Sequence, residues 1–267
     1  MALSCPNIDP VALAVGPLEI RWYALAYLAG FLFGWGYGIY ISRLSPGNRP
    51  NREDIDDFIP WVILGVILGG RLGYILFYQS AFYLENPIEV FMVWHGGMAF
   101  HGGIVGVVAS LVFYAHRRKI PLLRLCDIAG CAAPIGICLG RITNFINGEL
   151  YGRVSDVPWA VVFPRGGDLP RHPSQIYQAG LEGFLLFLIL LALLHVKAVR
   201  ERPGILSAVF LIGYGVLRSI GELFREPDAH LGFILEGITM GQVLSVPVIL
   251  FGIGVLYFAF KKKEVSS

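Results

Sequence analysis

Apolar residues in this sequence are gathered in blocks of about twenty, and this feature limits what the chain can fold into. A helix rises about 1.5 Å per residue, so such a block crosses a hydrocarbon core of about 30 Å. Charged residues make up only 15% of the chain, against roughly a quarter in a soluble domain. The blocks predict an all-α polytopic membrane protein of about seven transmembrane helices, over residues 21–41, 58–78, 98–115, 125–146, 176–196, 204–223 and 238–260.

The seven segments belong, on the sequence, to one integral membrane domain over residues 1–267. No repeat, low-complexity tract or long linker divides them. The segment 98–115 is the weakest of the seven, because glycines crowd its entrance at positions 96, 97, 102 and 103.

Lys and Arg gather in one set of alternate loops, among them 117–119 and 261–263. Cytoplasmic loops carry such an excess of basic residues. With an odd number of spans, this pattern predicts a cytoplasmic C-terminus and a periplasmic N-terminus. The long polar loop 147–175 then faces the periplasm.

Three arginines fall inside the apolar blocks: Arg71, Arg141 and Arg218. A charged side chain at a helix centre costs about 2.5–3.5 kcal/mol on insertion scales, so such residues normally face the protein interior and mark a polar pathway or a ligand. For Arg71, which lies among glycines, a functional role and a structural role as a buried ion pair or snorkelling side chain remain equally open.

The sixth block carries Tyr214, Arg218, Glu222 and Arg225 at spacings of four, four and three. These spacings place all four side chains on one face of a helix. Glu222 could simply neutralise Arg218. Two arginines around one glutamate nevertheless leave an excess positive charge, which favours an anionic ligand.

The end of the fourth block is unusually polar for a membrane helix. It contains Arg141, Asn144, Glu149 and Arg153 within thirteen residues. An unpaired amide in lipid costs several kcal/mol, so these side chains require a wet site lined by protein. A purely structural polar network is the alternative.

The segment 94–103 repeats His-Gly-Gly with a period of six, at His95 and His101. Six residues turn a helix by about 600°, so the two histidines would not share a face, which argues against a zinc site built on an i, i+4 pair. The glycines allow either irregular backbone or close helix approach. His101, the deeper of the two, is a general-base candidate because its ordinary pKa is about 6.5.

Two boundary residues add to the polar set. Tyr23 opens the first block beside Trp22, where membrane-interface anchoring explains it only in part. Ser174 opens the fifth block, which also contains Glu182, and for this serine a capping role and a functional role remain equally open. Three of the four cysteines lie in one apolar block at spacings that fit no zinc site, and we expect no metal.

Taken together, these motifs resemble those of the prolipoprotein diacylglyceryl transferases. Residues 140–153 resemble the family signature GRxGNFxNxExxGR, and the agreement extends to 95–103, 171–175, 181–183 and the stripe 214–222. Two departures stand out. Thr143 replaces a glycine, and Gln178 stands where a glutamate often follows the tyrosine, so we exclude position 178 from any catalytic role.

The resemblance implies an enzyme of the bacterial inner membrane that moves the diacylglyceryl group of phosphatidylglycerol to the lipobox cysteine thiol of prolipoproteins, releasing glycerol 1-phosphate. It implies no cofactor and no nucleic acid, and its partners are phosphatidylglycerol, prolipoprotein signal peptides and membrane lipids. The implied catalytic residues are His101, Arg141 and Arg218. The implied substrate-binding residues are Tyr23, Asn144, Glu149, Arg153, Tyr214 and Glu222.

Two other functions stay open on the residues alone. A transporter or channel for an anionic solute would also use buried Arg, Asn and Glu between glycine-rich helices, although no inverted repeat is visible. A phosphotransferase acting on lipid head groups would ordinarily need Mg²⁺ held by acidic clusters, and no Asp-rich motif lies in a span.

Overall fold

The computed structural model describes residues 3–6, 8–16, 18–45, 49–227, 232–234 and 237–264. By their contacts they form two compact units, one of residues 1–37 and 127–267 and the other of residues 38–126. Within the described residues, six helices are long and apolar enough to cross a membrane. The chain is therefore a mostly helical, multi-pass membrane protein.

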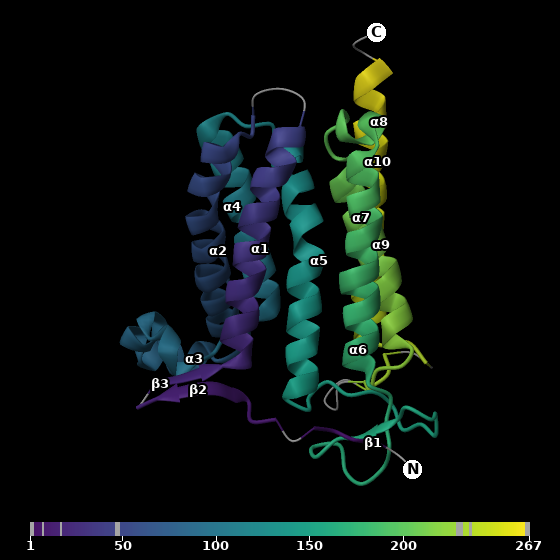
Figure 1. Ribbon diagram of the computed structural model, residues 1–267. Coiled ribbons are helices and arrows are strands. Elements are labelled where there is room, and N and C mark those ends of the chain that lie inside the picture. The colour runs from purple at the N-terminus through teal and green to yellow at the C-terminus, as the bar shows by residue number, and fades with distance from the viewer. Residues whose placement is uncertain are drawn as a thin grey trace. The chain divides into compact units, whose positions relative to one another are not determined.

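The first unit contains most of the helices. Helix α1 runs on into the second unit and α5 begins there. Pairs of small residues bring α1 against α5: a Cβ placed on Gly30 would lie 3.5 Å from the Cα of Gly136. Helices α9 and α10 pack along each other (Figure 1). The helices are α1 (Trp22–Leu44), α5 (Leu122–Ile146), α6 (Ser174–Gln178), the π-helix η3 (Ala179–Leu185), α7 (Leu186–His195), α8 (Lys197–Arg200), α9 (Ile205–Glu222) and α10 (Met240–Glu264).

The second unit is built on a close helix pair. A Cβ on Gly65 would lie 2.5 Å from the carbonyl oxygen of Gly106, and one on Gly69 would lie 2.3 Å from that of Gly102. Only glycine allows backbones to approach this closely, so of the two predicted alternatives close helix approach is confirmed at Gly102. Gly96 and Gly97 instead have irregular backbone with positive φ. The elements are α2 (Arg52–Tyr78), α3 (Ser80–Glu85), the 3₁₀ turns η1 (Pro87–Phe91) and η2 (Val93–His95), and α4 (Phe100–Arg118).

All seven predicted segments are helical, but α4 is not among the six helices that are long and apolar enough to span. Its ends carry His101 and the run 116–118, which lower its mean hydropathy. The seventh span therefore remains a prediction.

The described residues also form four short strands, which the all-α prediction did not include. β1 (Leu3–Ser4) pairs in parallel with β4 (Val161–Val162), and β2 (Val11–Val15) pairs antiparallel with β3 (Leu18–Arg21). They lie in the first unit, at the end of its helices where α5 stops and α6 begins (Figure 1). Strands this short carry too few alternating residues to stand out in a sequence.

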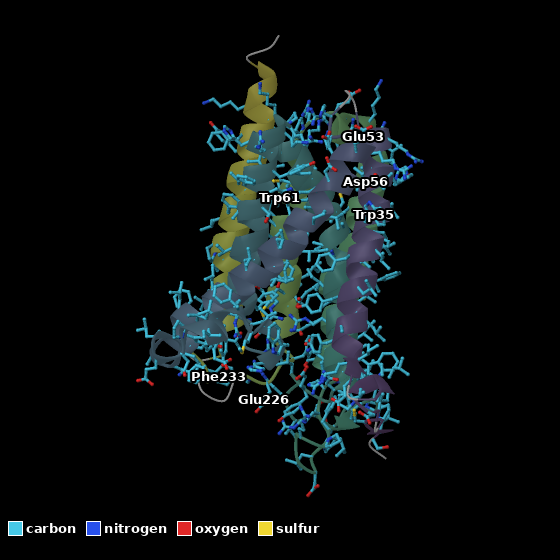
Figure 2. All side chains as sticks on the ribbon, turned by 90° about the vertical axis from the view of Figure 1, so that its left-hand side faces the viewer. Trp35, Glu53, Asp56, Trp61, Glu226 and Phe233 are labelled. Carbon is cyan, nitrogen blue, oxygen red and sulfur yellow. The ribbon has the colours of Figure 1, made fainter. Side chains whose placement is uncertain are left out.

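Polar side chains lie near a helix end and large apolar side chains lie further along the helices. In the second unit, Glu53 and Asp56 lie near one end of α2 and Trp61 lies further along it (Figure 2). In the first unit, Phe251 and Phe258 on α10 are each 66% exposed. Large exposed apolar side chains on a helix of this length are suited to contact with lipid.

Candidate active site

Glu182 is the centre of a buried ionic cluster in the first unit. It lies in the π-helix η3 and its side chain is completely buried. Its Oε2 pairs with Arg141 on α5 and its Oε1 with Arg218 on α9, each at 3.4 Å. A π-helical turn inserts one extra residue into a helix and occurs frequently at functional sites.

The close approach of η3 to α5 depends on Gly183. A Cβ at that position would lie only 2.5 Å from the Cβ of Cys138. Because Gly183 follows Glu182 directly, the same glycine that lets the helices touch also brings the carboxylate close to α5.

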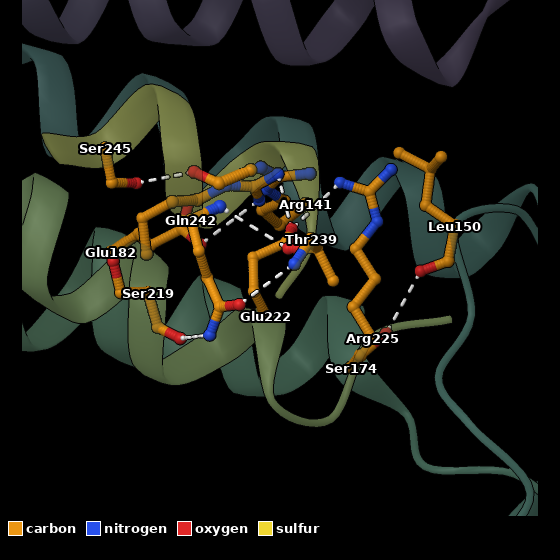
Figure 3. A network of polar contacts seen from close by, with 12 residues as sticks. Arg141, Leu150, Ser174, Glu182, Ser219, Glu222, Arg225, Thr239, Gln242 and Ser245 are labelled. Atoms are coloured by element: carbon orange, nitrogen blue, oxygen red, sulfur yellow. Dashed lines mark hydrogen bonds and ion pairs between the residues drawn. The ribbon is translucent and has the colours of Figure 1, made fainter. Parts of the chain in front are cut away.

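Glu222 forms the second half of the cluster, in contact with Arg218 and Arg225. Its Oε1 lies 2.7 Å from Arg218 and 3.2 Å from Arg225. Its Oε2 accepts a hydrogen bond of 2.8 Å from Thr239 (Figure 3). A Cβ on Gly241 would lie 2.6 Å from the Glu222 carboxyl carbon, so a larger residue there would displace this carboxylate.

The cluster carries an excess positive charge, since three arginines face the two carboxylates of Glu182 and Glu222. The sequence predicted such an excess from the α9 stripe alone. Among the described residues Arg141 contacts a single carboxylate, at 3.4 Å, although a guanidinium offers five N–H donors. Several donors of Arg141 are therefore available to an anion.

Tyr214 belongs to the same region. It lies one helical turn before Arg218 on α9, and its hydroxyl is within electrostatic reach of Glu182 and Arg218. Tyr214, Arg218 and Glu222 thus lie along one face of α9, as the spacing predicted, and Arg141 joins them from α5 through Glu182.

A second polar cluster joins α1 to the end of α5. Asn144 donates hydrogen bonds to the hydroxyl of Tyr23 and, over 3.0 Å, to Oε1 of Glu149. Asn147 donates to the same Glu149 oxygen over 3.3 Å. Tyr23, Asn147 and Glu149 line an open cavity of about 460 Å³, together with Asp9, Pro10, Val11, Arg21 and Arg165.

The loop after α5 is held by close backbone contacts. Gly148 has φ +63°, the left-handed region that ends a helix readily only with glycine. A Cβ on Gly152 would lie 2.5 Å from the carbonyl oxygens of both His172 and Phe224. These two glycines of the 140–153 motif therefore fix the path of the loop.

Ser174 and Arg153 also fasten this loop. Ser174 donates to the carbonyl of Leu150 over 3.0 Å and makes no cap for α6, so of its two open roles the capping one is wrong. Arg153 donates to the carbonyls of Arg225 and Glu222, at 3.0 and 3.4 Å. Its described contacts tie the loop to the end of α9, and its substrate-binding role stays a prediction.

His101 lies in the second unit, near the start of α4. It is exposed, and its one described contact is an edge-on packing against the Phe100 ring at 5.8 Å. Its role as general base remains a prediction.

Arg71, in the same second unit, is held by backbone oxygens. Its guanidinium donates to the carbonyls of Glu89, Val90, Met92, Gly96 and Gly97. The ring of Tyr83 covers it at 5.0 Å. The structure therefore favours the structural alternative for this arginine, as a clamp on the 87–97 segment.

Neither Cys5 nor His172, both outside the spans, is placed to be a charged reactant. Burial raises the pKa of the Cys5 thiol above its usual range, so it is protonated at neutral pH. Burial lowers the pKa of His172, whose Nδ1 lies 3.1 Å from the hydroxyl of Tyr177. Among the described residues, no three His, Cys, Asp or Glu side chains are grouped to hold a metal ion.

Sequence reasoning missed the central role of Glu182. The signal was present, because Glu182 is an ionisable residue in an otherwise apolar span, and such residues are functional candidates by default. It was passed over because its arginine partners lie 41 and 36 positions away in the chain. Thr239, which binds Glu222, carries no comparable signal in the sequence.

Comparison with known proteins agrees with the motif resemblance. Residues 10–258 match the family model described as prolipoprotein diacylglyceryl transferase. A protein of Azospirillum brasilense is 56% identical over 95% of both chains, and one of Rhodospirillum rubrum is 52% identical over 99% of this chain and 97% of its own. Each is named phosphatidylglycerol–prolipoprotein diacylglyceryl transferase. The chain described here belongs to the prolipoprotein diacylglyceryl transferase family of enzymes.

Proposed function

We propose that this protein transfers the diacylglyceryl group of phosphatidylglycerol to the lipobox cysteine thiol of prolipoproteins, and that glycerol 1-phosphate is released. The observation that carries the proposal is the buried cluster of Arg141, Arg218 and Arg225 with its excess positive charge. The names of the relatives supply the substrates. The anion transporter is not favoured, because the family is one of transferases.

At the glyceryl carbon the reaction makes one bond and breaks one. The cysteine sulfur of the prolipoprotein attacks the glyceryl carbon that carries the phosphate, and a C–S thioether bond forms. The C–O bond to the phosphate breaks, and its electron pair stays on the phosphate oxygen. The thiol proton passes to a base, and we assign that role to His101.

Arg141 and Arg218 stabilise the charge that develops on the phosphate. Arginine binds phosphate through parallel N–H···O bonds, and donors fixed in place before the reaction act most strongly in a site of low dielectric constant. Glu182 holds both guanidinium groups through one carboxylate. It positions them without occupying most of their donors.

We assign head-group binding to Tyr23, Asn144, Glu149, Arg153, Tyr214 and Glu222. The first three form the hydrogen-bonded cluster at the end of α5, and Tyr23 and Glu149 line the cavity there. Arg153 and Glu222 act through the arginine cluster and the loop that they fasten.

We further infer that the chain lies in the bacterial inner membrane with seven spans and a cytoplasmic C-terminus. The distribution of Lys and Arg supports this orientation. The 147–175 loop and the short strands then face the periplasm, where secreted prolipoproteins emerge.

Product analysis tests the function. The purified protein in detergent is mixed with phosphatidylglycerol and a lipobox peptide, and mass spectrometry follows the peptide. A thioether-linked diacylglyceryl peptide together with free glycerol 1-phosphate is expected. If proteoliposomes instead showed anion flux and no modified peptide formed, the protein would be a transporter and the transferase proposal would be wrong.

The base is tested separately with His101→Asn. If His101 takes the thiol proton, the variant should shift or flatten the pH–rate profile of the transfer. An unchanged pH–rate profile would remove His101 from this role while leaving the transfer reaction intact.

A further inference from the structure

Gln178, at the end of α6, is a buried amide without hydrogen-bond partners. Its side chain is completely buried, and neither its Nε2 nor its Oε1 has a partner among the described residues. The large majority of buried side-chain polar atoms in proteins have a hydrogen-bond partner. Gln178 is therefore an exception that calls for an explanation.

The amide lies beside the arginine cluster. The position that a Cβ would take on Gly221 is 3.7 Å from the Gln178 amide nitrogen and 3.4 Å from Oε1 of Glu182. Glu182 is the carboxylate shared by Arg141 and Arg218. The amide and this carboxylate thus approach the same glycine of α9.

Gln175 extends the same polar face of α6. It lies one helical turn before Gln178 and is also completely buried. Its Nε2 donates to the Glu149 carbonyl over 2.6 Å, but its Oε1 has no partner among the residues that the structure describes. One face of α6 therefore holds three polar atoms that have no described partner. Gln175 lies close to Glu149, and Gln178 lies close to Glu182.

The chemistry of these atoms selects a class of ligand. Two of the three are amide carbonyl oxygens, which only accept hydrogen bonds, and phosphate oxygens of a phosphodiester also only accept. Such carbonyls repel a phosphate and bind a hydroxyl, which donates and accepts. The free Nε2 of Gln178 can donate to the same hydroxyl groups.

We propose that Gln178, with Gln175, binds the hydroxyl groups of the glycerol head group and so selects a polyol head group on the donor lipid. This inference rests on the proposed transferase function and deepens it. A site built to bind a hydroxyl rejects an analogue that lacks one, because its buried polar groups are then left unpaired. Gln178 acts here as a specificity-determining residue and takes no part in the chemical step.

The test compares two donor lipids, phosphatidylglycerol and phosphatidylpropanol, whose head group lacks both hydroxyls. Gln178→Met keeps the size of the side chain but removes its hydrogen-bonding groups. It should lower kcat/KM for phosphatidylglycerol about tenfold or more and leave kcat/KM for phosphatidylpropanol unchanged. The selectivity between the two donors then falls by the same factor.

Gln242→Met is the matched control for protein stability. The Gln242 Oε1 accepts from the Thr239 amide at 3.0 Å and its Nε2 donates to the Ser219 carbonyl at 3.4 Å. Its loss should lower the Tm. Gln178→Met removes groups that have no described partner, so its Tm should be unchanged or higher while its selectivity falls.

Unchanged donor selectivity in Gln178→Met overturns the inference, whatever its Tm. If Gln178→Met does not fold, Gln178→Leu in the same assay gives the answer. A wild-type protein that transfers no diacylglyceryl group from either lipid contradicts the proposed function itself. Normal transfer by the wild type together with unchanged donor selectivity in Gln178→Met contradicts this inference alone.

Discussion

Arg71 and Arg141 are both arginines in apolar helices, but their surroundings differ. The guanidinium of Arg71 donates to five backbone carbonyls and packs on a tyrosine ring. Arg141 contacts one carboxylate among the described residues, at 3.4 Å. Arg218, its neighbour across Glu182, contacts two carboxylates.

The number of satisfied donors therefore distinguishes an arginine with a structural role from the one that we propose to bind a ligand. Charge alone does not, because both types carry it at a similar position along a helix. All five N–H groups of Arg71 are used by these carbonyls, whereas most of those of Arg141 have no partner among the described residues. The sequence shows both as an arginine near glycines and cannot make this distinction.

Replacing Arg141 or Arg218 by alanine should give the largest effect on catalysis. Loss of one charge-stabilising donor group typically lowers kcat by about 10²–10³-fold. We expect this loss in the transfer of radiolabelled diacylglyceryl to a lipobox peptide. Arg141→Lys should recover only part of the rate, because lysine cannot make two parallel bonds to phosphate. Near-normal transfer by either alanine variant would end the phosphate-binding interpretation.

Arg71→Ala should act on stability. It removes the donor that binds five carbonyls of the 87–97 segment, and each lost intramolecular hydrogen bond typically costs about 0.5–1.5 kcal/mol. We expect a clear fall in Tm in detergent, with the rate per folded molecule largely kept. A variant with normal Tm and no transfer would contradict the assignment of Arg71 to the structural class.

Glu182→Gln should have an intermediate effect. The amide keeps the size and one acceptor but removes the charge that holds Arg141 and Arg218. We expect kcat to fall about tenfold, in line with a loss of roughly 1.4 kcal/mol, while KM for phosphatidylglycerol changes less. Steady-state kinetics in mixed micelles measures both values. A change confined to KM would mean that Glu182 tunes binding and does not position the arginines for the reaction.

His172→Asn should have the smallest effect, confined to the pH dependence of stability. Burial lowers the folded-state pKa of His172 below its ordinary value of 6.5. The unfolded chain therefore binds the proton more readily, and stability falls as the pH drops below about 6.5. Tm measured between pH 5 and 8 should decline less on the acid side in the variant. An equal decline would assign the acid sensitivity to other groups.

Much of the fold was predictable, because length and hydropathy dictate membrane helices. The ends of the predicted segment 125–146 lie within three residues of α5. The short strands were not predictable, since β1 pairs with β4 across more than 150 residues and each has only two residues. The π-helix was also invisible, because its extra residue depends on packing at Gly183.

The candidate site was predictable where its residues share a helix. The stripe Tyr214, Arg218, Glu222 and Arg225 follows from helical periodicity. Glu182 and Thr239 were missed because tertiary contact brings them to the arginines. Gln178 was excluded by its departure from a motif, whereas its burial and unpaired amide become visible only in the structure.

The odd number of charges in the arginine cluster has a consequence for turnover. Three arginines and two glutamates leave one positive charge, which one phosphodiester neutralises. Cleavage converts that diester into a phosphate monoester, which carries about 1.5 to 2 negative charges near pH 7. Glu182 and Glu222, which hold the arginines in place, then repel the surplus negative charge. If the cluster binds the lipid phosphate as proposed, its charge balance therefore also favours release of the cleaved head group.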